Sequence, residues 1–363
     1  MGTKKADFFD SRDKYLSFVN STNEKSSIAF KLSSYLKKVQ IKSDAFRIFD
    51  AGTGEGTIIS TLLSAAHEQF PEDPIYVVGK EISVDDIENL LSFLADRFFE
   101  HKNLIFCITN ASYKEFTNKN LSKIKFIKKE LKGNTSFNFT KQLMRMNSLI
   151  KKNWELKEDN KSTLLIPKSK TFLAIYREDQ KIALDHLIPR KINDIPDKFN
   201  FIIASQAFRL RSPYKRTMKL IIQPLLNMLE TKGQFFLIYS SGSDFTKKIL
   251  KYFFPTINPF QYNDPKEFIK EVNKDKLNKN LFKISVASFI YTFINMSLTS
   301  KKSFSPVNSL GLWNAATYVG QISEKEQKAL NINTKLLDKV SEMGQKQPLR
   351  FKDILLRFEK IRD

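Results

Sequence analysis

The stretch Ile48-Phe49-Asp50-Ala51-Gly52-Thr53-Gly54-Glu55-Gly56 decides the fold of this chain. It begins at the end of a short apolar run, residues 46–50, and then places a glycine at every second position. Because glycine has no Cβ atom, the backbone here can turn tightly and approach a ligand closely. Apolar residues at helical spacing follow over residues 58–66, and the first N–H groups of such a helix have no partner within it. The stretch therefore predicts a strand, a ligand-binding loop and a helix, in that order.

Strand and helix patterns continue to alternate beyond this loop. Apolar runs and helical spacing predict further strands at residues 75–80, 104–109, 199–204 and 233–239 and helices at residues 85–97 and 214–230. Such alternation is typical of an α/β fold with a doubly wound, mostly parallel, Rossmann-like sheet. These sheets bind ligands at the carboxyl ends of their strands, so the residues that follow each strand are the candidates for a site.

Four parts are expected along the chain. Residues 1–44 form an N-terminal helical lid, and residues 45–112 and 198–250 form the Rossmann-like core. A long basic insertion, residues 113–197, separates the two halves of the core, and residues 251–363 form a C-terminal elaboration on the substrate side. Further elements are expected within these parts: helices over residues 11–42 with a turn at residues 20–24, a helix near residues 137–151, and strands near residues 163–166, 171–176 and 285–293.

Composition narrows the class of protein. Hydrophobic residues make up 41% of the 363 residues and charged residues 27%, so the chain can build a packed core and is not wholly disordered. The single cysteine, Cys107, excludes a disulfide framework and a cysteine-built zinc site, and the three histidines stand at unrelated positions, so no metal site is expected. The first ten residues show no export signal, and no clean run of about 18 apolar residues exists. We therefore expect a cytoplasmic protein with no membrane partner.

The net charge leaves two explanations open. The chain has 60 Lys and Arg residues against 39 Asp and Glu residues, a formal net charge of +21. A strongly basic surface attracts polyanions, so RNA is one candidate partner. The abundant Lys, Asn, Ile and Phe residues all have A/T-rich codons, however, so genome bias alone can produce the same balance. We favour a solvated basic face over a nucleic-acid groove.

The residues that follow the strands restrict the choice of cofactor. A P-loop needs Lys and then Ser or Thr after its last glycine, but Gly56 is followed by Thr57 and Ile58. The acid before the first glycine, Asp50, suits a cationic or aminoacyl cofactor better than a pyrophosphate, which it would repel. Glu81 ends the second predicted strand, where a carboxylate can accept the hydroxyl groups of a ribose. Asn110 follows the third strand, where the edge of an adenine would lie.

This set of residues resembles the class I S-adenosylmethionine-dependent methyltransferases. The resemblance implies a cofactor, S-adenosylmethionine, with S-adenosylhomocysteine as its product, and it implies that the glycine loop holds the aminoacyl and ribose parts. The cofactor-binding residues that it implies are Tyr15, Asp50, Ala51, Gly52, Thr53, Gly54, Gly56, Glu81, Ile82, Asn110, Ala111 and Ser205. The alternative is a glycine loop surrounded by surface acids, with Tyr15 packed in the core.

Several segments further resemble the histamine N-methyltransferases. They are residues 18–24, 81–87, 201–206, 236–244 and 311–313. The resemblance implies that Glu24 binds the amine of the substrate and that Gln206 contacts the substrate, so we take both as the candidate catalytic residues. A carboxylate can hold an ammonium group or take its proton, and an amide can orient an acceptor. The alternatives are a helix cap at Glu24 and a surface amide at Gln206. The insertion has no counterpart in that family, and the family's C-terminal asparagine ligand finds no match.

We therefore expect a methyltransferase that transfers a methyl group in line to the nitrogen of a small amine or an amino-acid-like molecule. Two alternatives remain. One is a methyltransferase that acts on RNA or on a protein side chain. The other is a catalytically silent binding protein with the same fold. The sequence does not determine the acceptor, the number of methyl groups or the oligomeric state.

Overall fold

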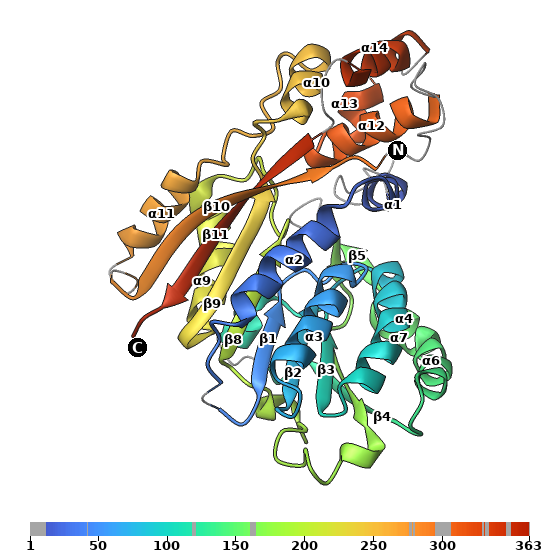
Figure 1. The fold of residues 1–363 in the computed structure, drawn as a ribbon, viewed down its shortest axis with the longest axis vertical. Helices are drawn as coiled ribbons and strands as arrows, with labels where there is room; N and C mark the ends of the chain where they lie inside the picture. Colours follow the sequence, from blue (N-terminus) through green and yellow to red (C-terminus); the bar gives the residue numbers. More distant parts are fainter. Residues whose placement is uncertain are drawn as a thin grey trace.

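A computed structural model describes residues 12–41, 43–117, 121–159, 165–275, 280–294, 306–328, 334–345 and 350–362, together with residues 278 and 330. Within these residues, one nine-stranded sheet runs through the molecule in the order β10-β11-β9-β8-β1-β2-β3-β7-β4 (Figure 1). Its strands are β1 (Phe46–Asp50), β2 (Ile75–Lys80), β3 (Leu104–Thr109), β4 (Lys125–Leu131), β7 (Thr171–Arg177), β8 (Phe199–Ser205), β9 (Leu229–Ser240), β10 (Phe282–Thr292) and β11 (Arg350–Lys360).

The centre of this sheet has doubly wound topology. Strands β3, β2, β1, β8 and β9 pair in parallel. The chain moves outward from β1 to β2 and β3, and then returns to add β8 on the other side of β1. The prediction of a mixed α/β fold with a mostly parallel, doubly wound sheet is confirmed. Its switch point lies between β1 and β8, where such sheets bind ligands.

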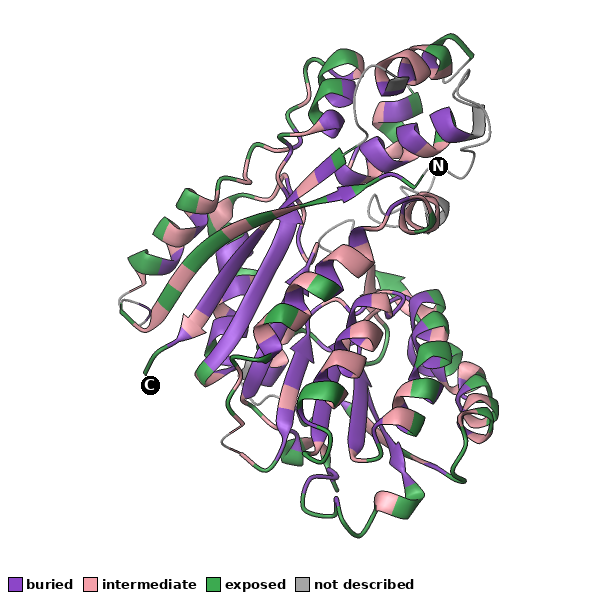
Figure 2. Ribbon diagram, in the orientation of Figure 1, coloured by how far each residue is buried: buried purple, intermediate pink, exposed green. Residues whose placement is uncertain are grey.

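Helices cover both faces of the sheet. On one face lie α2 (Glu24–Leu36), α3 (Thr57–Gln69) and α4 (Val84–Glu100), and their apolar residues form one core layer with the strands. On the other face, residues 214–227 and the short helix α5 (Tyr113–Thr117) pack into a second layer. The inner strands are buried while the outer faces of the helices are exposed (Figure 2). Helix α4 shows the sequence basis: Ser83 caps it by accepting a hydrogen bond from the Asp86 amide, and its apolar residues recur at helical spacing.

Residues 113–197 extend the central sheet. Strand β7 pairs antiparallel with β3, and β4 pairs in parallel with β7. The single helix expected near residues 137–151 is instead two helices, α6 (Ser136–Met144) and α7 (Asn147–Asn153), because the chain bends between them to bury Leu143 and Ile150 in the same core layer. Of the strand expected at residues 163–166, residues 163 and 164 lie outside the described residues. The rest belongs to β6 (Leu165–Pro167), which pairs with β5 (Leu156–Glu158).

The junction near residue 229 differs from the prediction. The helical stretch that begins at Tyr214 includes a π-helical turn (Met218–Ile222) and ends with α9 (Gln223–Asn227), so Leu229 is already in β9 rather than in the helix. A shift in the pairing of β8 with β9, with Phe199 opposite Leu229 but Phe201 opposite Gln234, accommodates the extra residues. Such a bulge breaks the alternation that marks a strand, so the sequence pattern placed the start of β9 too late.

A helical cap lies at the carboxyl end of the parallel strands. It consists of α1 (Arg12–Ser21), α10 (Phe245–Phe253), α12 (Pro306–Val319), α13 (Glu324–Lys328) and α14 (Thr334–Gln345) (Figure 1). Its own apolar cluster includes Phe18 and Trp313. The turn between α1 and α2 is tied to the end of β10, since the Asn23 amide donates to the Thr292 carbonyl over 3.1 Å. No described helix combines the length and the apolar character that a membrane span needs.

Candidate active site

The glycine loop lies directly beneath the first helix of the cap. Gly54 and Gly56 adopt left-handed backbone conformations, with φ values of 56° and 98°. A Cβ atom on Gly54 would lie 2.9 Å from the Tyr15 hydroxyl oxygen, so Tyr15 would have to shift to make room for it. The Tyr15 hydroxyl is 3.4 Å from Oε2 of Glu55. The structure thus brings the predicted lid residue Tyr15 onto the predicted loop.

Glu81 joins the end of β2 to this loop. Its Oε2 accepts a hydrogen bond from the Gly54 amide over 3.0 Å, and its Oε1 accepts from the amides of Ile82 and Ser83 over 2.7 and 2.8 Å. A carboxylate has about four acceptor positions, so about one remains for a ligand unless the Gly54 contact is exchanged. Burial raises the pKa of Glu81. Glu81 and Ile82 therefore lie beside the loop, as the sequence predicted.

Asp50 is buried where β1 enters the loop. Its Oδ1 accepts a hydrogen bond from the Gly52 amide over 3.2 Å, and burial raises its pKa to about 7. Ala51 is anchored from both sides, because its amide donates to the Ile203 carbonyl and its own carbonyl accepts from the Tyr113 hydroxyl. The sequence analysis did not single out Tyr113, since nothing in the pattern relates it to the loop.

Asn110 and Ala111 follow β3, next to the end of β2 where Glu81 stands, and both are held by hydrogen bonds within the protein. The Asn110 amide nitrogen donates to the carbonyls of Asn153 and Ser169 over 3.3 and 3.1 Å, and its oxygen accepts from the Thr171 amide over 2.7 Å. The Ala111 amide donates to the Thr109 hydroxyl over 3.1 Å. The side chain predicted to meet adenine is thus occupied in joining β3 to β7 and α7.

Glu24 and Gln206, the two candidate catalytic residues, are in direct contact. The Gln206 amide nitrogen donates to Oε1 of Glu24 over 3.2 Å and to Oδ2 of Asp353 over 3.3 Å. Glu24 and Asp353 are both buried, and Asp353 is 0% exposed. Burial, followed by the charge of Glu24, raises the pKa of Asp353 well above its usual range. One amide therefore holds together two buried carboxyl groups from α2 and β11.

The backbone of Gln206 is strained. Its φ is 52°, which is uncommon for a residue with a Cβ atom, and its amide donates to the Ile238 carbonyl over 2.8 Å. Strained residues of this kind cluster at functional sites, where the surrounding structure fixes them. Here the strain turns the side chain that follows β8 toward Glu24 and Asp353.

Asp353 is the site residue that the sequence analysis missed. It stands on β11 between the buried Phe351 and Leu355, on the same face of the strand. A signal for it was present in the sequence, because an acid there interrupts an alternating apolar pattern. Only the order of the strands, however, brings β11 beside β9 and so places Asp353 next to Ser240.

Several buried polar atoms without a hydrogen-bond partner lie at this edge of the sheet, and others lie elsewhere in the described residues. Most buried polar groups in proteins have a partner, so the atoms at this edge are available to a ligand. They come from the glycine loop and from the ends of β8, β9, β10 and β11. The atoms are Thr53 Oγ1, Glu55 Oε1, Ser205 Oγ, Ser240 Oγ, the Tyr291 hydroxyl and Asp353 Oδ1.

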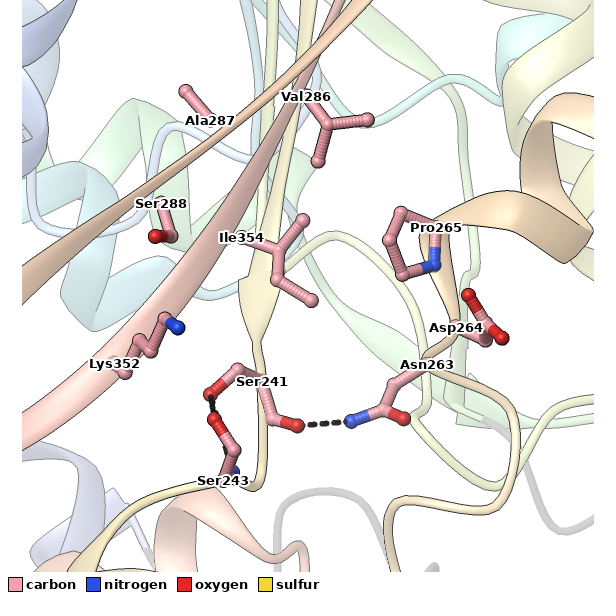
Figure 3. A pocket seen from close by; sticks show the side chains of 10 residues that line it. All are labelled: Ser241, Ser243, Asn263, Asp264, Pro265, Val286, Ala287, Ser288, Lys352 and Ile354. Carbon is pink, nitrogen blue, oxygen red and sulfur yellow. Dashed lines mark hydrogen bonds between the residues drawn. The ribbon is translucent and has the colours of Figure 1, made fainter.

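A separate pocket lies on the other face of β11. It has a volume of about 500 Å³ and is lined by residues that include Ser241, Asn263, Val286, Lys352 and Ile354 (Figure 3). Lys352 and Ile354 flank Asp353 along the strand, so their side chains point away from the Asp353 side. None of the sequence-predicted site residues lines this pocket, and we assign the candidate active site to the strand ends instead.

No protein-family model matches the sequence, and no curated protein matches it. The chain is similar to solved methyltransferase structures, with low sequence identities and low TM-scores. An S-adenosylmethionine-dependent methyltransferase from Archaeoglobus fulgidus is 10% identical, with a TM-score of 0.36, over 93% of this chain and 95% of that one. Phosphoethanolamine N-methyltransferase 2 from Haemonchus contortus, crystallised with S-adenosylmethionine, is 12% identical, with a TM-score of 0.34, over 99% of this chain and 61% of that one.

A class I methyltransferase structure from Listeria monocytogenes is 11% identical, with a TM-score of 0.33, over 92% of this chain. This chain spans 60% of the length of that protein. At identities and TM-scores this low, the fold assignment rests on the strand order and the hydrogen-bonded registers of the chain itself.

Proposed function

We propose that this protein is an S-adenosylmethionine-dependent methyltransferase that methylates the nitrogen of a small amine. The observation that carries the proposal is the Gln206 amide, held between two buried carboxyl groups beside a glycine loop at the switch point of a doubly wound sheet. Carboxyl groups are suited to hold an ammonium group, and the switch point is where such sheets place a nucleotide.

The residues at the glycine loop fit the proposed cofactor. When bound, S-adenosylmethionine supplies a methyl group on a positively charged sulfur. Gly54 and Gly56 allow close approach to the backbone, and Oε2 of Glu81 faces the loop with about one acceptor position left for a ribose hydroxyl. The unpartnered hydroxyls of Thr53 and Ser205 offer further hydrogen bonds. Acids around the loop favour a cation.

The carboxyl groups of Glu24 and Asp353 have different roles at the methyl acceptor. An amine attacks only when its nitrogen lone pair is free, so its proton must be taken up before transfer. The raised pKa of Asp353 favours its protonated form, and we assign to Glu24 the role of base or ammonium ligand. The remaining role of the protein is to align the acceptor, which Gln206 supports through its fixed amide.

The first experiment is calorimetric titration with S-adenosylmethionine and S-adenosylhomocysteine. We expect micromolar binding of both. Glu81→Ala should weaken binding by at least about tenfold, because it removes the acceptor between β2 and the loop. Glu68→Ala, at an exposed acid on α3, is the matched control and should bind like the wild type. Unchanged binding by Glu81→Ala would show that the ribose is not held there.

A second experiment separates the acceptor classes. Formation of S-adenosylhomocysteine is measured with pools of small amines, RNA and peptides. The burial of Glu24 and Asp353 favours small amines over polymers. Turnover with RNA or peptides alone would instead favour the macromolecular alternative suggested by the net charge of +21. Cofactor binding without turnover in any pool would favour a silent binding protein.

A further inference from the structure

The candidate site has two halves: the glycine loop, which we call the loop side, and the group of Glu24, Gln206 and Asp353, which we call the acceptor side. Lys25 lies between them. It is the second residue of α2, and its side chain is 12% exposed. Its Nζ is 3.0 Å from Oε2 of Glu24, on the acceptor side. The same Nζ is 5.9 Å from the centre of the Tyr15 ring, which lies over the glycine loop. One ammonium group is thus placed next to residues of both halves.

The surroundings of Lys25 are acidic. Besides Glu24, it interacts electrostatically with Asp50 and Glu55 on the loop side and with Asp353 on the acceptor side. Burial disfavours its charge, but these neighbours, Glu24 foremost, raise its pKa, so the ammonium form persists. If Lys25 served only to neutralise Glu24, the pair would contribute little to the free energy of folding, because two charges must be desolvated to form it.

The chemistry of the proposed cofactor offers a use for this cation. The amino-acid end of S-adenosylmethionine carries an ammonium group and a carboxylate. The acids of the loop suit the ammonium group and the sulfonium, but they would repel the carboxylate. The carboxylate needs a cation, and Lys25 supplies one beside Tyr15 and the loop.

We propose that Lys25 binds the carboxylate at the amino-acid end of the cofactor, an inference that rests on the proposed function. In the free protein, Glu24 occupies the ammonium group of Lys25. When a carboxylate takes its place, Oε2 of Glu24 is released for the amine acceptor. The cofactor then prepares the acceptor site, and Lys25 links the two halves.

The test compares ligands that differ only at the amino-acid end. S-adenosylhomocysteine carries the whole amino acid, its decarboxylated analogue lacks the carboxylate, and 5′-methylthioadenosine lacks both charged groups. The wild type should bind S-adenosylhomocysteine at least about tenfold more tightly than the decarboxylated analogue, as measured by calorimetry. Equal affinity for these two ligands overturns the proposal without any variant.

The variant Lys25→Met should weaken binding of S-adenosylhomocysteine by at least about tenfold and leave 5′-methylthioadenosine unchanged. Lys31→Met is the matched control, because Lys31 lies on the same helix but contacts the ring of Tyr35, and it should bind both ligands like the wild type. Unchanged or tighter binding of S-adenosylhomocysteine by Lys25→Met overturns the assignment. An equal loss for both ligands also overturns it, since the effect is then not directed at the carboxylate.

Failure of the proposed function looks different. A wild-type protein that binds none of the three ligands refutes the cofactor itself. A wild type that binds all three with equal affinity keeps the nucleoside site but removes the role of Lys25.

Discussion

Two strands of the sheet end in the same pair of residue types. A hydroxyl and then an amide, Thr109 and Asn110, stand at the end of β3, and Ser205 and Gln206 stand at the end of β8. At β3 both side chains are used inside the protein: Thr109 donates to the Thr171 carbonyl, and Asn110 makes three hydrogen bonds. At β8 the Ser205 hydroxyl has no partner, and Gln206 makes two long bonds from a strained backbone.

The neighbouring elements explain this difference. The end of β3 lies opposite the start of β7. There the backbone groups of Thr171 bond to the side chains of Thr109 and Asn110. The end of β8 lies beside the glycine loop, and the Gln206 side chain contacts the side chains of Glu24 and Asp353 rather than backbone groups. The comparison teaches that a polar residue after a strand marks the edge of the sheet, whereas availability to a ligand depends on what packs against that edge.

The largest expected effect is on stability at the end of β3. Asn110→Ala removes three buried hydrogen bonds and leaves their partners unsatisfied, so we expect the free energy of unfolding to fall by about 3 kcal/mol. Urea unfolding measures this, and the affinity of the folded variant for S-adenosylhomocysteine should stay close to that of the wild type. A stable variant with weakened affinity would mean that Asn110 contacts the ligand after all.

The second expected effect is an increase in stability. Asp353→Asn keeps an oxygen that can accept from Gln206 but removes a carboxyl group whose pKa is raised by burial. Such a group stabilises the folded state below its unfolded pKa, and this stability is lost as the pH rises through the folded pKa. We therefore expect the variant to be about 2 kcal/mol more stable than the wild type at pH 8 and equally stable near pH 4.

Thermal unfolding across this pH range provides the measurement for Asp353→Asn. Because asparagine resembles the protonated carboxyl group that we assign to Asp353, the stabilised variant should keep methyl transfer to amines. A variant that is more stable but inactive would show that Asp353 acts as a charged carboxylate at the acceptor site, against the assignment of the base to Glu24.

The smallest effects come from the two hydroxyls. Thr109→Val removes two hydrogen bonds and should lower the free energy of unfolding by about 1.5 kcal/mol. Ser205→Ala removes a hydroxyl without a partner and should change it by less than about 0.5 kcal/mol. Chemical unfolding of both variants in parallel checks the contrast. Equal losses at the two sites would show that Ser205 is as structural as Thr109.

The strands nearest the glycine loop followed directly from sequence patterns. The apolar runs at residues 46–50, 75–80 and 104–109 are β1, β2 and β3. Buried parallel strands are continuous apolar runs, and the glycines and polar residues that end them are equally local signals. The contact between Tyr15 and the loop, and that between Glu24 and Gln206, agree with the residues that the sequence singled out.

Other features had no local signal. The division of residues 137–151 into two helices depends on what each half buries, and the early start of β9 depends on a bulge in its pairing with β8. Whether the predicted residues bind a cofactor remains a prediction, as do the four proposed parts of the chain.

The sequence by itself determined the doubly wound class, the glycine loop and the set of polar residues at the strand ends, because hydrophobic period and backbone freedom are properties of neighbouring residues. Only the tertiary structure decided which of those residues face one another. It brought Asp353 to Gln206 across 147 positions of the chain and placed Lys25 among the acids. Side-chain availability depends on packing between elements distant in sequence, and no local pattern records that packing.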